Sequence, residues 1–176
     1  MSAARSRIQP LLTEEVLQGR IRELGLQITA DYAGKDLIVV GLLNGVYPFF
    51  ADLTRAMPME MDVSFMQVAS YHGGTHSTGE VKIIKDLDRA IQGRHCLVVE
   101  DIVDTGTTLH KVRNLLMDRE PASLKVATLL DKPSRRKTEV PVDYIGFTIE
   151  DKFVVGYGLD FDGKFRNLPF VGVYTP

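Results

Sequence analysis

The segment LVVEDIVDTGTTL, residues 97–109, holds the residue types and spacing in this chain that are best suited to chemistry. Its first half is an apolar, β-branched run typical of a buried strand. Glu100 and Asp101 place two adjacent carboxylates at or near the end of that run, and Asp104 adds a third after three residues. Carboxylate oxygens are ligands that hard divalent cations prefer. The pattern therefore predicts an acidic wall that attracts a metal ion.

The residues that follow predict an anion site beside this wall. Asp104, Thr105, Gly106, Thr107 and Thr108 form a turn that enters a helix, where unpaired backbone N–H groups and the helix dipole favour an anion. Glycine permits close backbone approach, and the threonines add hydroxyl donors. The alternative is an ordinary helix start with Asp104 as its N-cap. Neither GxxxxGK[ST] nor GxGxxG occurs here, so a Walker loop and a dinucleotide fingerprint are excluded for this segment.

Alternating helices and strands must position these groups. The predicted helices cover residues 13–32, 47–56 and 109–119, and the predicted strands cover 37–43, 62–69, 81–84, 96–102, 126–130 and 144–149. This alternation, with short connections, predicts an α/β domain with an open, mostly parallel sheet flanked by helices. Ligands of such sheets bind beyond the carboxyl ends of the strands. No linker or repeat interrupts the pattern, so we expect a single domain over residues 1–176.

Composition limits the classes of function. The chain has 176 residues, 44% of them hydrophobic, and a formal net charge of −2, which excludes whole-chain disorder and a global basic field for nucleic acid. Its one cysteine, Cys96, cannot form an internal disulfide, which favours a reducing compartment. Apolar runs are far shorter than a membrane span, and residues 1–10 lack a signal-peptide pattern. We therefore expect a cytoplasmic protein with no membrane partner.

Residues 98–109, VVEDIVDTGTTL, resemble the phosphoribosyl pyrophosphate motif of the type I phosphoribosyltransferases. The resemblance extends over about residues 37–166, and the segment DKFVVGYGLD narrows it to the hypoxanthine-guanine members. It implies a small hood formed by the terminal segments. It also implies transfer of the 5-phosphoribosyl group of phosphoribosyl pyrophosphate to N9 of a 6-oxopurine, with Mg²⁺ as cofactor. Hypoxanthine or guanine would give IMP or GMP and pyrophosphate, in purine salvage. By analogy, we expect a homodimer or homotetramer.

The resemblance assigns roles to the acidic segment. The turn over residues 104–108 would hold the 5′-phosphate, and Glu100 and Asp101 would face the ribose hydroxyls and the magnesium bound there. Asp104 would accept the proton from N7 of the purine. Asp160 would be associated with a second magnesium ion.

Other assigned positions concern the purine base and pyrophosphate. Lys132 would donate to O6 of the base, and Val154 would contact the base edge through its backbone. Phe153 would stack on the purine, although the apolar pattern alone favours a core position for it. Arg166 would contact pyrophosphate. The segment around residues 150–170 would form the base-binding hood.

Two loops complete the implied site. Ser70 and Tyr71 match a pair in the family's mobile lid, here at about residues 70–80. Leu43-Asn44-Gly45 matches a loop in which many members have Leu-Lys-Gly with a non-proline cis peptide whose N–H meets pyrophosphate. Asn44 and Gly45 can retain backbone contacts, but the lysine charge is lost.

Alternative functions differ in the ligand they require. A xanthine-preferring transferase remains open, because hypoxanthine, guanine and xanthine all carry O6. The other alternative is a nucleotide-sensing regulator of the same fold that binds RNA, with Arg135-Arg136-Lys137 as a basic surface.

Overall fold

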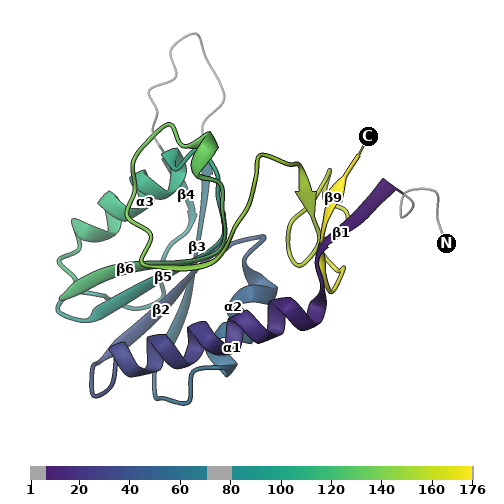
Figure 1. Ribbon diagram of the computed structural model, residues 1–176. Coiled ribbons are helices and arrows are strands. Elements are labelled where there is room, and N and C mark those ends of the chain that lie inside the picture. Colours follow the sequence, from purple (N-terminus) through teal and green to yellow (C-terminus); the bar gives the residue numbers. More distant parts are fainter. Residues whose placement is uncertain (1–6, 71–80, 176) are drawn as a thin grey trace, which may run out of the picture.

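The computed structural model describes residues 7–70 and 81–175, and its main sheet has the predicted form. Six strands run in the order β4-β3-β2-β5-β6-β7, all parallel except β4, which pairs antiparallel with β3 (Figure 1). The strands are β2 (Leu37–Leu43), β3 (Asp62–Ser70), β4 (Val81–Lys85), β5 (His95–Val103), β6 (Ser123–Asp131) and β7 (Tyr144–Thr148). The predicted open, mostly parallel α/β sheet is confirmed.

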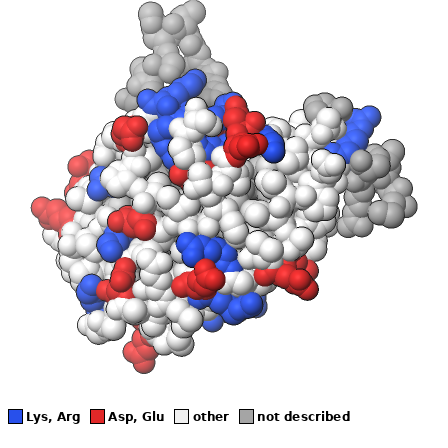
Figure 2. Space-filling model, in the orientation of Figure 1, with Lys and Arg blue, Asp and Glu red and all other residues white. Residues whose placement is uncertain are grey.

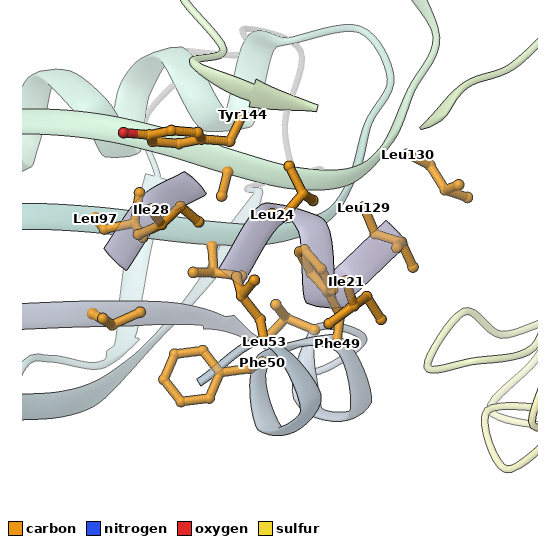
Figure 3. Packing of buried hydrophobic residues seen from close by; sticks show 14 of the residues in the cluster. Ile21, Leu24, Ile28, Phe49, Phe50, Leu53, Leu97, Leu129, Leu130 and Tyr144 are labelled. Carbon is orange, nitrogen blue, oxygen red and sulfur yellow. The ribbon is translucent and has the colours of Figure 1, made fainter. Parts of the chain in front are cut away.

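Helices cover both faces of this sheet. The helices are α1 (Glu14–Asp31), α2 (Tyr47–Arg55) and α3 (Thr107–Met117), with a 3₁₀ turn, η2 (Pro133–Arg135), after β6. Side chains of α1 and α2 pack with β2, β5 and β6 in one apolar cluster, where Ile21, Leu24 and Phe49 are almost fully buried (Figure 3). Side chains of α3 pack in a second cluster on the other face. No helix in the described ranges is long and apolar enough to span a membrane.

A second, three-stranded sheet joins segments near the two ends of the described chain. Its strands are β1 (Ile8–Leu12), β9 (Val171–Tyr174) and β8 (Val154–Val155), and both pairings are antiparallel. Figure 1 shows this small sheet beside the main one, with α1 leading away from it. It matches the hood expected from the terminal segments. Periodicity did not predict its strands, because β1 contains Pro10 and β8 has only two residues.

Hydrogen bonds attach the hood to the helical layer. The Tyr157 hydroxyl, in the segment after β8, donates to the Asp52 carboxylate of α2. Gln18 of α1 donates to the same carboxylate at 2.6 Å. These bonds lower the pKa of Asp52 against the opposing effect of burial. The hood is therefore bonded to the layer that covers the main sheet.

The two helices on one face approach closely at a glycine. A Cβ atom added to Gly25 of α1 would lie 2.5 Å from the carbonyl oxygen of Ala56, just after α2. A Cβ atom added to Gly19, also in α1, would meet nothing within 4 Å. Gly25 thus has a packing role that Gly19 lacks.

This contrast predicts opposite effects of the same substitution. We expect Gly25→Ala to lower the free energy of unfolding by about 1–3 kcal/mol through overpacking. Gly19→Ala should raise it by about 0.5–1 kcal/mol, because alanine favours a helix over glycine. Denaturant unfolding of both variants measures the two effects. Equal shifts in the two variants would contradict the close approach at Gly25.

Candidate active site

Two partly buried carboxylates lie on the last part of β5. Beyond Val99, β5 pairs with β6 but no longer with β2, which leaves Glu100 and Asp101 where the sheet opens on one side. The Glu100 Oε2 atom is buried and has no hydrogen-bond partner among the described residues. Asp101 Oδ1 accepts a hydrogen bond of 2.8 Å from the N–H of Ile102. The acidic wall predicted from the sequence is therefore present and only partly satisfied by the protein.

Burial makes ionisation of this pair unfavourable. It raises the pKa of Glu100 well above its ordinary value, and the neighbouring charge of Asp101 adds to the effect. It also raises the pKa of Asp101 to about 6, although the Ile102 N–H and Arg166 act in the opposite direction. A bound cation would offset both effects. The buried, unpartnered oxygen of Glu100 therefore fits a metal site.

The described residues supply only part of a metal coordination shell. No group of three or more metal-ligating side chains occurs in residues 7–70 and 81–175. Mg²⁺ is commonly held by one or two carboxylates together with water and substrate oxygens. The Glu100–Asp101 pair meets that requirement if the substrate provides further oxygens.

The turn after β5 lines a cavity, and Glu100 is also part of the lining. Gly106 has φ of +78°, a left-handed conformation that glycine adopts at no steric cost, and it is the N-cap of α3. The interpretation of Asp104 as the N-cap is therefore wrong. The cavity has a volume of about 200 Å³. Its lining residues are Glu100, Ile102, Val103, Asp104, Thr105, Gly106, Thr108 and Leu109. Thr107 begins α3, and its hydroxyl lies 3.2 Å from that of Thr138.

Asp104 projects from this turn to an arginine that the sequence did not connect with it. Arg135 Nε lies 2.8 Å from Asp104 Oδ1, and Arg135 Nη1 lies 3.4 Å from Asp151 Oδ2. These groups are partly exposed, so the ion pairs are open to solvent. Arg135 thus connects Asp104, in the turn after β5, with Asp151, just before β8.

Lys132 is held at the end of β6. Its backbone N–H donates to the carbonyl of Val103, and its ammonium group donates to the carbonyl of Lys152 at 2.5 Å. The residue is only 6% exposed, and Asp151 Oδ1 lies 3.9 Å from its Nζ. An ammonium group has three donors, so Lys132 retains donors for a ligand. Lys132 is therefore buried at the end of β6 and is not a solvated loop residue.

Phe153 presents an accessible ring, contrary to the core position that its pattern favours. It is 52% exposed, and the rings of Phe161 and Tyr174 meet it edge-on at centroid distances of 5.7 and 6.2 Å. Val154, the first residue of β8, is buried. The hood therefore offers an exposed aromatic face supported from behind by other rings.

A tight contact joins the turn after β2 to the hood and to the acidic wall. A Cβ atom added to Gly45 would lie 1.8 Å from Asp101 Oδ2 and 3.3 Å from Arg166 Nη1. A Cβ atom added to Gly158 would lie 1.9 Å from the carbonyl oxygen of Gly45. Asn44 is exposed, and the Leu43–Asn44 peptide bond is cis, as the resemblance implies.

Arg166 and Asp160 pair at this junction. Arg166 Nη2 lies 2.7 Å from Asp160 Oδ1, and Arg166 Nη1 donates to the carbonyl of Gly158 at 2.6 Å. The other carboxylate oxygen of Asp160 accepts a 2.7 Å bond from the N–H of Gly163. Both oxygens of Asp160 are thus engaged within the hood, and its role toward a second magnesium ion stays a prediction.

The predicted lid is described only at its first residue. Ser70 is the last residue of β3, and its backbone pairs with Val81 of β4. Tyr71 and residues 72–80 lie outside the described residues.

Comparison with known proteins agrees with this geometry. A family model described as the phosphoribosyl transferase domain matches residues 12–162. The chain belongs to this phosphoribosyltransferase family.

This phosphoribosyltransferase is similar to proteins named for purine substrates. It is 51% identical over 166 residues to a hypoxanthine-guanine phosphoribosyltransferase of Staphylococcus aureus strain Mu50, covering 94% of this chain and 93% of that protein. It is 50% identical over 167 residues to the hypoxanthine phosphoribosyltransferase of Escherichia coli K12, covering 94% of each. A crystal structure of a hypoxanthine phosphoribosyltransferase from Staphylococcus aureus superposes with a TM-score of 0.94 at 48% identity, covering 99% of this chain and 96% of that one.

The phosphoribosyltransferase also contains site residues that sequence reasoning missed. The sequence pattern marks Arg135 only as part of a basic run, and it gives no role to Asp151 or Asp131. The signal available was position: Asp131 ends β6, the strand next to β5. Side chains at the ends of adjacent parallel strands lie close together, so Asp131 was a candidate neighbour of Asp104.

The raised pKa of Asp101 makes stability depend on pH. An unfolded aspartate titrates near about 3.9, whereas Asp101 titrates at about 6 in the fold. The folded state binds this proton more tightly, so the stability contribution is fully present below about pH 4 and is lost as pH rises through 6. Asp101→Asn cannot ionise. In EDTA, we expect the gain in melting temperature from Asp101→Asn to be larger at pH 7.5 than at pH 5.

A matched control is Asp118→Asn at the exposed end of α3. Its effect on the melting temperature should not show this increase with pH. A gain from Asp101→Asn that is the same at both pH values would argue against a raised pKa for this buried carboxyl.

Proposed function

We propose that this chain transfers the 5-phosphoribosyl group of phosphoribosyl pyrophosphate to N9 of a 6-oxopurine, hypoxanthine and/or guanine, and releases pyrophosphate. The relatives named for this activity match nearly the whole chain at about half identity, which supports the reaction class. The observation that carries the proposal is the junction of three separate segments, which bear Asp104, Lys132 and Phe153. Lys132 bonds to the carbonyl of Lys152, next to Phe153, and Arg135 pairs with both Asp104 and Asp151.

Each group at this junction has one role toward the base. The exposed ring of Phe153 stacks on the purine, and the remaining donors of Lys132 reach O6. Because an ammonium group only donates, it favours a carbonyl at this position over the amino group of adenine. The backbone of Val154 contacts the edge of the base. Asp104 accepts the N7 proton as N9 attacks the sugar.

The sugar and phosphates occupy the other side of the site. The backbone of residues 104–108 binds the 5′-phosphate in the cavity at the start of α3. The backbone of Asn44 and Gly45, together with Arg166, contacts pyrophosphate. Ser70 and Tyr71 close over the reacting atoms and exclude water. Residues 70–80 act as a lid and residues 150–170 as a base-binding hood within one domain.

Enzymes of this family are generally Mg²⁺-dependent, and the acidic pair suits that ion. Glu100 and Asp101 would hold it, with Asp160 assigned to a second ion. When bound, magnesium neutralises the charge that develops on the departing pyrophosphate. The chain itself holds the ribose hydroxyls at Glu100 and Asp101. By family resemblance, the protein works in the cytoplasm as a homodimer or homotetramer.

The regulator alternative is less well supported. In the basic run after β6, Arg135 pairs with two carboxylates and Arg136 pairs with Asp131, so neither guanidinium is available as an unpaired phosphate contact. Figure 2 shows basic side chains gathered near the loop after β6, with acidic side chains beside them, and mixed charge over the rest of that face. An extended basic surface for RNA is not visible on it.

A competition assay tests the proposed reaction. Hypoxanthine, guanine, xanthine and adenine are offered together with phosphoribosyl pyrophosphate and Mg²⁺, and the consumption of each is followed by chromatography. We expect hypoxanthine, guanine or both to be consumed, and adenine to remain. Preferential use of xanthine would favour the alternative of a xanthine-preferring transferase. If no base is consumed at any magnesium concentration, the transferase proposal fails and the regulator is favoured.

The base role of Asp104 is tested by Asp104→Asn. We expect turnover to fall by about 10²- to 10⁴-fold, the usual contribution of a positioned general base. Binding of phosphoribosyl pyrophosphate, measured by calorimetry, should largely persist because the backbone donors of the turn remain. Asp118→Asn serves as the matched control. Unchanged turnover in Asp104→Asn would remove this carboxylate from the mechanism.

A further inference from the structure

Arg136 is the most buried arginine near the site, and the function proposed above gives it no role. Its side chain is 12% exposed and is ion-paired with Asp131, which is 8% exposed. The same guanidinium donates from Nη1 to the backbone carbonyl of Asp104 at 3.0 Å. One planar guanidinium therefore connects the end of β6 with Asp104, the first residue of the turn over residues 104–108, which is called the phosphate turn below.

The aliphatic part of Arg136 also contacts this turn. A Cβ atom added to Gly106 would lie 2.9 Å from Arg136 Cδ and 2.4 Å from the carbonyl oxygen of Thr138. The side chain thus packs beneath Gly106, whose left-handed backbone sets where α3 begins. Any shift of Arg136 would disturb the turn at its first and third residues.

The residues after Arg136 continue along the back of the turn. The N–H groups of Lys137 and Thr138 both donate to the carbonyl of Thr105, at 2.9 and 3.1 Å. The carbonyls of Asp104 and Thr105 are therefore satisfied from behind, by residues 136–138. Residues of the same turn also line the cavity at the start of α3.

We propose that Arg136 is a positioning residue that keeps the turn over residues 104–108 at a fixed position relative to Lys132. Asp131 precedes Lys132 directly, so the Asp131–Arg136–Asp104 connection joins the group proposed to bind O6 to the group proposed to accept the N7 proton. O6 and N7 are neighbouring atoms on one edge of a 6-oxopurine, so these two groups must lie at a fixed separation to contact both. Arg136 is not among the residues that line the cavity at the start of α3. The proposal rests on the function proposed above.

Geometry, rather than charge, is what this role requires. Arginine presents several donors in a rigid planar fork, and lysine presents a single point charge. In Arg136, one terminal nitrogen faces Asp131 and the other faces the Asp104 carbonyl. Lysine can keep the charge opposite Asp131, but its one ammonium group cannot reproduce both directions of the fork.

The test is Arg136→Lys, with Arg22→Lys on the exposed side of α1 as the matched control. Removing the arginine charge altogether would leave Asp131 buried and unpaired, which is strongly destabilising, so the lysine variant is used to preserve folding. We expect Arg136→Lys to lower kcat by about 10²-fold, the scale of a small misplacement of catalytic groups. The dissociation constant for phosphoribosyl pyrophosphate, measured by calorimetry, should rise by about 10-fold or more. Arg22→Lys should change neither quantity.

A second variant separates positioning from stability. In Asp131→Asn/Arg136→Met the buried charges are removed together, so thermal stability should recover relative to Arg136→Met alone while kcat stays low. Wild-type kcat in Arg136→Lys, or recovery of kcat with stability in the double variant, would overturn the proposal. Failure of the function itself would look different, because the wild-type protein would then consume no purine.

Discussion

The structure depends most on the placement of two adjacent carboxylates where their charges are costly. Glu100 and Asp101 lie on the last part of β5, which pairs with β6 but not with β2, and burial raises the pKa of both. A fold optimised for stability alone would put apolar side chains at these positions. The cost is consistent with a site that is completed by a cation and a polar substrate, and the nearby guanidinium of Arg166 offsets only part of it.

The surrounding segments can be understood from what they supply to this pair. The turn at Gly45 is free of a side chain, so Asp101 and the hood approach it closely. The turn at Gly106 starts α3 beside Glu100 and lines the adjoining cavity. The hood contributes Arg166 on one side and the ring of Phe153 on the other. Hydrogen bonds from Tyr157 and Gln18 to Asp52 then keep the hood attached to the helical layer.

Much of this arrangement could be predicted from the sequence, and the exceptions have physical causes. Apolar periodicity predicted the strands of the main sheet and the three helices, because their inward faces are regular. It did not predict β1, whose residues are mostly exposed, or the start of α3, which depends on the left-handed backbone of Gly106. Local spacing predicted the acidic wall and turn. It gave no sign of Arg136 behind the turn, since that contact depends on how residues 132–138 return across the sheet.

The pairing of β1 with β9 has a consequence for the order of assembly. These strands lie near opposite ends of the described chain, so the small sheet can form only after β9 has been synthesised. The strands that carry the acidic pair, the phosphate turn and Lys132 precede it and can fold earlier on the ribosome. The nascent chain would therefore have the acidic pair and Lys132 in place before β9 supports the ring of Phe153, so the aromatic part of the hood would be the last part of the site to form.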